Sequence, residues 1–171
     1  MAVEDEIIQL LESIRYGDQL SKRLFIWMQT LEKLVNYLEM TSGYICRHDF
    51  RRRITINVCQ YVSSQSGIHE SKSHPGETFF ESQFPKTLAW LQSGNPDPRI
   101  IHMDEMTTDD PELQEYLDNH VLTALMLKLF SAEGIWGYIE LWDTQCRREF
   151  DASMLEAAQK VARGISRSIP T

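Results

Sequence analysis

Along residues 137–142, aromatic and acidic side chains alternate with glycine and aliphatic side chains, and the aromatic and acidic residues are of types that suit a binding site. Tyr138, Glu140 and Trp142 fall on one face of an expected strand, because strand side chains alternate with a period of two. Such a face could line a mostly apolar ligand pocket with a few polar groups, or it could be a solvated edge. Glu140 separates the two interpretations, since a buried carboxylate without a partner is costly.

A second group of candidates comes earlier in the chain. Asp110-Pro111 has the residue types of a helix start, a cap followed by a Pro in the first turn. Tyr116 and His120 would then lie one turn apart on that helix. His120 could bind a ligand carboxylate or a haem iron, although a single His more often packs through a hydrogen bond. The predicted ligand-binding residues are Asp104, Tyr116, His120, Tyr138, Glu140 and Trp142.

The three cysteines offer a different chemistry, because a reactive thiolate with a resolving Cys can reduce a sulfoxide. Cys46 and Cys59 could be cross-strand neighbours in a hairpin, in a register that the sequence leaves open, and Cys146 lies in a loop. Only Arg47 and Arg147 offer nearby positive charge. Thiol catalysis is therefore the less favoured interpretation, and we expect no catalytic residues.

A heptad-like repeat of large apolar residues marks the helix expected over residues 18–40. Its members recur at alternating spacings of four and three: Leu20, Leu24, Trp27, Leu31, Leu34 and Leu38. Because this stripe is broad, we predict that it forms a homodimer interface as well as covering the sheet. The alternative is a helix buried only against its own sheet. Residues 1–17 are expected to be an N-terminal helical extension.

The remaining pattern predicts an α+β fold. Adjacent strands with short turns favour an antiparallel sheet, and the helices between strands should cover one face while the terminal helices cover the other. Residues 63–77 are expected to be a long surface loop. The expected strands are 44–48, 54–62, 99–104, 122–130 and 135–143, and the expected helices are 85 to about 94, 111–120 and the segment after Asp151.

Composition narrows the functional classes. The formal net charge of −8 opposes binding to nucleic acid or anionic lipid. The basic cluster at 51–53 is expected to be a solvated turn or a docking patch for an acidic partner. No stretch approaches the roughly 20 apolar residues of a membrane helix, and the acidic N-terminus does not resemble a signal peptide. An odd number of cysteines favours the cytoplasm. His69 and His74 lack the spacing of a zinc site, so no metal is expected.

The end of the chain resembles a GAF domain, a small sensor and dimerisation module of signalling proteins. The resemblance rests on residues 134–143 with the helix that follows, on Asp104 with Asp110-Pro111, and on the segment Tyr116-Leu-Asp-Asn119. It covers residues 18–171 and implies a central antiparallel sheet of five to six strands. It also implies terminal helices on one face, which commonly form a dimer bundle, and a ligand pocket under short helices on the other.

Within that family, Tyr116-Leu-Asp-Asn119 looks most like the bilin-binding phytochrome branch, in which a Cys-His pair precedes the Tyr-Leu by two residues. This chain has Glu112 and Leu113 there, so no covalent bilin is expected. The resemblance implies a sensing and dimerisation domain of a signal-transduction protein, with an unknown small molecule and an output domain as partners. The alternatives are a ligand-free dimerisation module and, less favoured, a free methionine sulfoxide reductase.

Overall fold

The computed structural model describes residues 20–64 and 75–170, so the extension predicted over residues 1–17 lies outside the described part, as do His69 and His74. The described strands are β1 (Ser42–Asp49), β2 (Ile54–Val62), β3 (Thr78–Phe80), β4 (Arg99–His102), β5 (Thr123–Ser131) and β6 (Gly134–Asp143). The described helices are α2 (Leu20–Tyr37), α3 (Pro85–Gln92), α4 (Leu113–Asp118) and α5 (Ala152–Ser168), with short 3-10 turns η2 (Glu81–Gln83) and η3 (Met103–Glu105).

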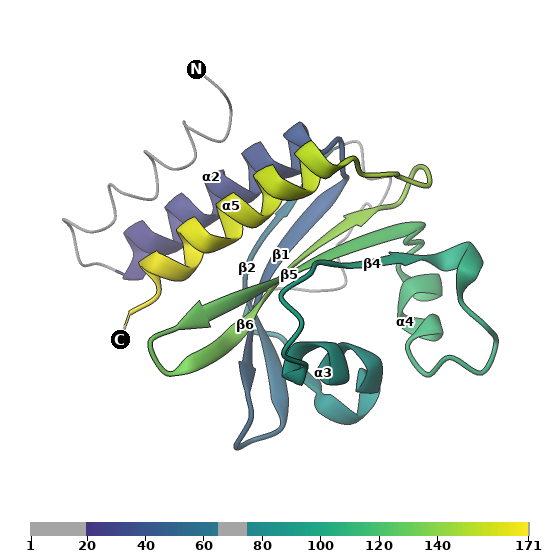
Figure 1. The fold of residues 1–171 in the computed structure, drawn as a ribbon, viewed down its shortest axis with the longest axis horizontal. Coiled ribbons are helices and arrows are strands. Elements are labelled where there is room, and N and C mark those ends of the chain that lie inside the picture. Colours follow the sequence, from purple (N-terminus) through teal and green to yellow (C-terminus); the bar gives the residue numbers. More distant parts are fainter. Residues whose placement is uncertain (1–19, 65–74, 171) are drawn as a thin grey trace.

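The six strands form one antiparallel sheet in the order β3-β2-β1-β6-β5-β4. Figure 1 shows α2 and α5 side by side across one face, and α3 and α4 on the other side of the sheet. This arrangement confirms the predicted α+β fold with its two long helices on one face.

The face of the sheet under α2 and α5 forms the apolar core. Ile45, Leu127 and Ile139 from the sheet are almost fully buried, and so are Leu31 from α2 and Ile165 from α5. α5 begins where predicted, because the side chain of its N-cap residue accepts a hydrogen bond from a backbone N–H of the first turn. Apolar burial of this kind contributes on the order of 1.5–3 kcal/mol for each large side chain.

The stripe predicted as a dimer interface lies mostly inside this core. Trp27, Leu31, Leu34 and Leu38 are at most 2% exposed. The indole of Trp27 packs edge-on against Trp136 and donates a hydrogen bond of 2.8 Å to Ser168. The stripe is broad because it packs on both the sheet and α5, and these four side chains have little exposed surface.

Element boundaries differ from the predicted ones where backbone geometry decides them. α2 ends at Tyr37 because Glu39 adopts a positive φ of 55°, a left-handed conformation that ends helices. β1 then begins at Ser42, two residues before the strand expected at 44–48. β3 was not predicted: it has only three residues, follows an aperiodic segment, and pairs with the edge of β2.

A bulge in β2, where Val58 has no opposite residue on β1, settles the cysteine register. Cys59 pairs with Ile45, whereas Cys46 pairs with Asn57, and the register shifts between Ile45 and Cys46. The two thiols therefore lie on opposite faces of the sheet: Cys59 in the core under α2, and Cys46 in the cluster on the other side. They cannot act as a neighbouring thiol pair.

None of the helices in the described part of the chain is long and apolar enough to cross a membrane.

Candidate functional site

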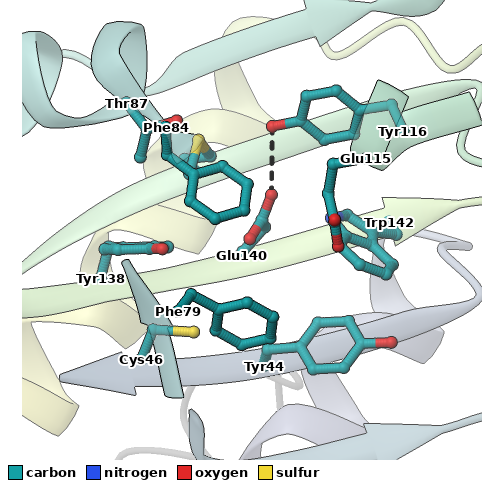
Figure 2. A pocket seen from close by; sticks show the side chains of 11 residues that line it. Tyr44, Cys46, Phe79, Phe84, Thr87, Glu115, Tyr116, Tyr138, Glu140 and Trp142 are labelled. Carbon is teal, nitrogen blue, oxygen red and sulfur yellow. Dashed lines mark hydrogen bonds between the residues drawn. The ribbon is translucent and has the colours of Figure 1, made fainter. Parts of the chain in front are cut away.

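A small cavity lies on the sheet face opposite α2 and α5, between β1, β6 and α4 (Figure 2). Its volume is about 30 Å³, which is room for roughly one or two water molecules. Its lining is aromatic with a few polar groups, the composition typical of ligand sites. The lining residues are Tyr44, Cys46, Phe79, Phe84, Thr87, Glu115, Tyr116, Met126, Tyr138, Glu140 and Trp142.

Glu140 lies in the middle of this lining, with its carboxylate pointing toward Tyr116 (Figure 2). The Tyr116 hydroxyl donates a hydrogen bond of 3.3 Å to one carboxylate oxygen. Burial raises the pKa of Glu140 from 4.5 to about 7, and the neighbouring Trp142 and Tyr116 only partly oppose that rise. The cavity therefore contains an acid that changes charge near neutral pH.

The other two predicted strand residues flank this carboxylate. Tyr138 and Trp142 are 5% and 6% exposed, and the ring of Trp142 lies 4.6 Å from that of Tyr44 on β1. The indole N–H of Trp142 is buried and lies close enough to the Glu140 carboxylate to lower its pKa, but it makes no hydrogen bond of good geometry within residues 20–64 and 75–170. Burial also raises the pKa of the Tyr138 hydroxyl, which stays neutral. The site thus holds a poorly satisfied donor beside a carboxylate.

The structure does not bring Asp104 or His120 to the cavity. Asp104 is exposed on η3, where it pairs with Arg147 at 2.5 Å. His120 is exposed with a positive φ of 56°, because α4 has already ended and the chain turns back to hydrogen-bond at Tyr116. A continuous helix would have placed His120 beside Tyr116, but the turn points it to solvent. Four of the six predicted residues line the cavity.

Several lining residues escaped the sequence analysis. Tyr44 and Cys46 alternate along β1 on the same face, so a period-two pattern of the kind used for β6 could have indicated them. Phe79 and Phe84 flank a 3-10 turn and Glu115 lies on a short helix, and none of these segments has a periodicity that marks a pocket. Only the folding of the chain over the sheet brings them to the cavity.

A shallow outer groove of about 390 Å³ lies beside the cavity. Phe79 and Glu115 line both spaces, so the cavity and the groove adjoin at these two side chains. The other groove residues are Glu77, Thr78, Phe80, Gln83, Asp118 and Asn119.

Glu112, the residue at the position where the phytochrome branch carries its Cys, is fully buried. It accepts hydrogen bonds from the Thr87 backbone N–H at 2.6 Å and the Thr87 hydroxyl at 3.1 Å. Arg99 on β4 pairs with it at 2.9 Å and also donates to the Thr87 hydroxyl. This network joins α3, β4 and the start of α4, so Glu112 stabilises the layer that covers the cavity.

The thiols lie in environments that oppose thiolate formation. Burial raises the pKa of Cys46 well above 9.0 and that of Cys59 to about 12. The pKa of Cys146 is also raised, first by desolvation and then by the negative charge of Asp143. Because the thiolate is the reactive form, these cysteines have little nucleophilic character. Within the described residues, no group of three His, Cys, Asp or Glu side chains could hold a metal ion.

Comparisons with solved structures identify the fold of the chain, whereas comparisons of its sequence give no match. No family model matches the chain, and no curated protein sequence matches it. The solved phycocyanobilin-bound GAF domain from a cyanobacterial phytochrome superposes with a TM-score of 0.79 at 13% identity, covering 98% of this chain and 93% of that one. A phycoerythrobilin-bound GAF domain from a cyanobacterial phytochrome gives 0.76 at 13% identity, covering 96% and 95%.

The chromophore-binding domain of a Stigmatella aurantiaca bacteriophytochrome gives a TM-score of 0.72 at 14% identity, covering 96% of this chain and 59% of that one. The chain therefore has the GAF fold, as its terminal strand and helix predicted. At such low identity these likenesses establish the architecture, and the ligands in those structures belong to those proteins.

Proposed function

We propose that this chain is a small-molecule sensing and dimerisation domain of a signal-transduction protein. The observation that carries the proposal is the cavity around Glu140, which places a partly buried carboxylate and the poorly satisfied indole N–H of Trp142 among aromatic side chains. Buried polar groups normally have partners. A ligand that supplies them would gain hydrogen bonds that the closed cavity lacks.

β6 offers a direct route from ligand to output. Tyr138 and Trp142 face the cavity, whereas Ile139 and Leu141, between them in sequence, are fully buried against α2 and α5. A ligand that shifts the strand on one face therefore changes helix packing on the other. Small displacements of packed helices are a common means of biasing an attached output domain.

The ligand is expected to bind without a covalent bond. Glu112 replaces the family thiol, and Cys46, the thiol lining the cavity, stays protonated because burial raises its pKa. Incubation with biliverdin or phycocyanobilin, followed by a denaturing gel, should show no zinc-fluorescent band. A fluorescent band that disappears in Cys46→Ala would contradict this expectation and identify the attachment site.

Dimerisation is proposed through the outward side of α2 instead of the buried stripe. Two large apolar side chains there remain exposed, Phe25 by 55% and Met28 by 39%. At the ends of the helix, Leu20, the first member of the stripe, is 66% exposed and Tyr37 is 39% exposed. Sedimentation of the wild-type domain should show a dimer, and Phe25→Asp should give a folded monomer. A wild-type domain that sediments as a monomer at high micromolar concentration would exclude this part of the proposal.

Native mass spectrometry of the purified domain, followed by a thermal-shift screen of small molecules, separates sensing from ligand-free dimerisation. A bound mass that is lost in Glu140→Gln supports sensing through this cavity. A domain that dimerises, purifies empty and responds to no compound is a dimerisation module. The thiol-reductase alternative predicts turnover of free methionine sulfoxide, which the separated, protonated thiols disfavour. We place the protein in the cytoplasm, where free cysteines stay reduced.

A further inference from the structure

The charged side chains among the described residues that line the cavity are carboxylates, and this favours some ligands over others. Glu140 and Glu115 line the cavity, and Glu77, Glu115 and Asp118 line the adjoining groove. No Lys, Arg or His is among the described residues that line either space. Arg99, which acts on Glu140, is paired with Glu112. Among these lining residues, an anionic ligand would meet carboxylates and no cationic side chain.

The aromatic lining favours a positive charge as well. Aromatic faces carry negative potential and attract cations, most strongly where water is excluded. Figure 2 shows these rings around the Glu140 carboxylate. They are Tyr44, Phe79, Phe84, Tyr116, Tyr138 and Trp142. Carboxylates and aromatic faces together form an environment suited to an organic cation.

The two volumes decide which kind of cation fits. The cavity of about 30 Å³ accommodates roughly one or two waters, and a primary ammonium group is about the size of a water molecule. A trimethylammonium group is several times larger and does not fit there. The groove of about 390 Å³ beyond Phe79 and Glu115 has room for an alkyl chain.

We propose that the cavity binds the head of a primary alkylammonium ion, which donates hydrogen bonds to Glu140 and Glu115 while its chain leaves past Phe79 into the groove. This inference rests on the proposed sensing function and adds the ligand class. A ligand oxygen next to the ammonium group would also accept the hydrogen bond that the Trp142 indole N–H offers.

The pH dependence follows from the charge of Glu140. The groups that face it are Glu115 and Tyr116 from α4, Cys46 from β1, Tyr138 from its own strand and Arg99 from β4. Burial raises the pKa values of Tyr116, Tyr138 and Cys46, so these groups stay neutral, and an alkyl amine stays protonated because its pKa is near the Lys value of about 10.4. Affinity therefore rises as Glu140 ionises around pH 7 and levels off above it.

Isothermal titration with three probes of one chain length tests the proposal: 1-aminobutane, its neutral counterpart 1-butanol, and butyltrimethylammonium. We expect 1-aminobutane to bind, and the other two not to bind. Glu140→Gln should weaken amine binding by about tenfold or more, because a hydrogen bond to a charged group contributes about 1.5–3 kcal/mol. Glu133→Gln makes the same chemical change at an exposed turn and should leave affinity unchanged.

Equal binding of 1-butanol, equal binding of the quaternary ion, unchanged affinity in Glu140→Gln, or no amine binding would each overturn the proposal. Other results distinguish a wrong ligand class from a wrong sensing function. If a molecule of another class binds and Glu140→Gln or Trp142→Phe abolishes its binding, the cavity is a sensor site with a different ligand. If nothing binds the cavity in any screen, both proposals fail.

Discussion

The two faces of the sheet are built from the same strands but contain different chemistry. The face under α2 and α5 is filled by aliphatic side chains with almost no exposed area. On the opposite face, Tyr138, Glu140 and Trp142 of β6 lie with Tyr116 of α4 around a small cavity, and the polar groups there are only partly satisfied. One face therefore supplies stability, and the other keeps the unsatisfied polar groups that a ligand can use.

The comparison also explains why β6 needs both of its faces. Ile139 and Leu141 pack the strand against α2 and α5, so Glu140 between them can be polar without unfolding the sheet. Sites of this kind commonly depart from the best packing, and the rest of the fold compensates for the cost. Substitutions on the two faces should consequently have effects that differ in size and in pH dependence.

The largest effect is expected from Leu31→Asp, in the core between the sheet and α2. Leu31 is 0% exposed, and the change removes a buried aliphatic side chain and introduces an unpaired charge, a loss of about 5 kcal/mol or more. The variant should be unfolded by circular dichroism. Phe25→Asp on the exposed side of the same helix is the matched control and should stay folded. A folded Leu31→Asp would show that α2 does not pack as described.

The next effect concerns the buried ion pair of the pocket face. Glu112→Gln leaves Arg99, which is only 16% exposed, without its charge partner, and breaking a buried pair typically costs about 3–5 kcal/mol. Urea unfolding should show that loss. The double variant Glu112→Gln/Arg99→Met should regain part of it, since no uncompensated charge then remains. Equal stability of wild type and Glu112→Gln would contradict a structural role for this network.

Glu140→Gln should stabilise the domain by an amount that grows with pH. The Glu140 pKa is about 7 in the fold and 4.5 ordinarily, so between these values the folded state keeps a proton that the unfolded state has lost. Wild-type stability therefore falls as pH rises from about 4.5 to about 7. Removing the acid should gain up to about 3 kcal/mol at pH 8 and nothing at pH 4.

Urea unfolding of Glu140→Gln and Glu133→Gln at both pH values measures this difference. Glu133 lies exposed in the β5–β6 turn, so its variant should match wild type at each pH. A Glu140→Gln variant whose stability relative to wild type does not change with pH would mean that Glu140 titrates in the fold as it does in water.

The smallest effect is expected at the start of α5. The Asp151 side chain accepts a hydrogen bond of 2.8 Å from the Met154 N–H, and replacing such an N-cap by Ala typically costs about 1 kcal/mol. Asp151→Ala should lower the melting temperature by a few degrees and leave ligand binding intact. A loss well above about 2 kcal/mol would indicate that Asp151 does more than cap the helix.

Local sequence determined the elements whose signals are local. Alternation fixed β2 and β6 to within a residue, and Asp151 marked the start of α5, because strand periodicity and helix caps depend only on neighbouring residues. The same alternation put Tyr138, Glu140 and Trp142 on one face. Since a strand side chain can point to only one face or the other, that part of the candidate site was predictable.

Tertiary structure decided what depends on partners far away in sequence. The stripe on α2 had an apolar surface that suited either a sheet or a second protomer, and only packing against α5 and the sheet assigned it to the core. A single bulge in β2 put Cys46 and Cys59 on opposite faces, because shifting a strand by one residue reverses its side chains. A turn after α4 moved His120 into solvent, and the chain's path over the sheet brought Phe79, Phe84 and Glu115 to the cavity. These outcomes depend on long-range contacts, which local spacing does not encode.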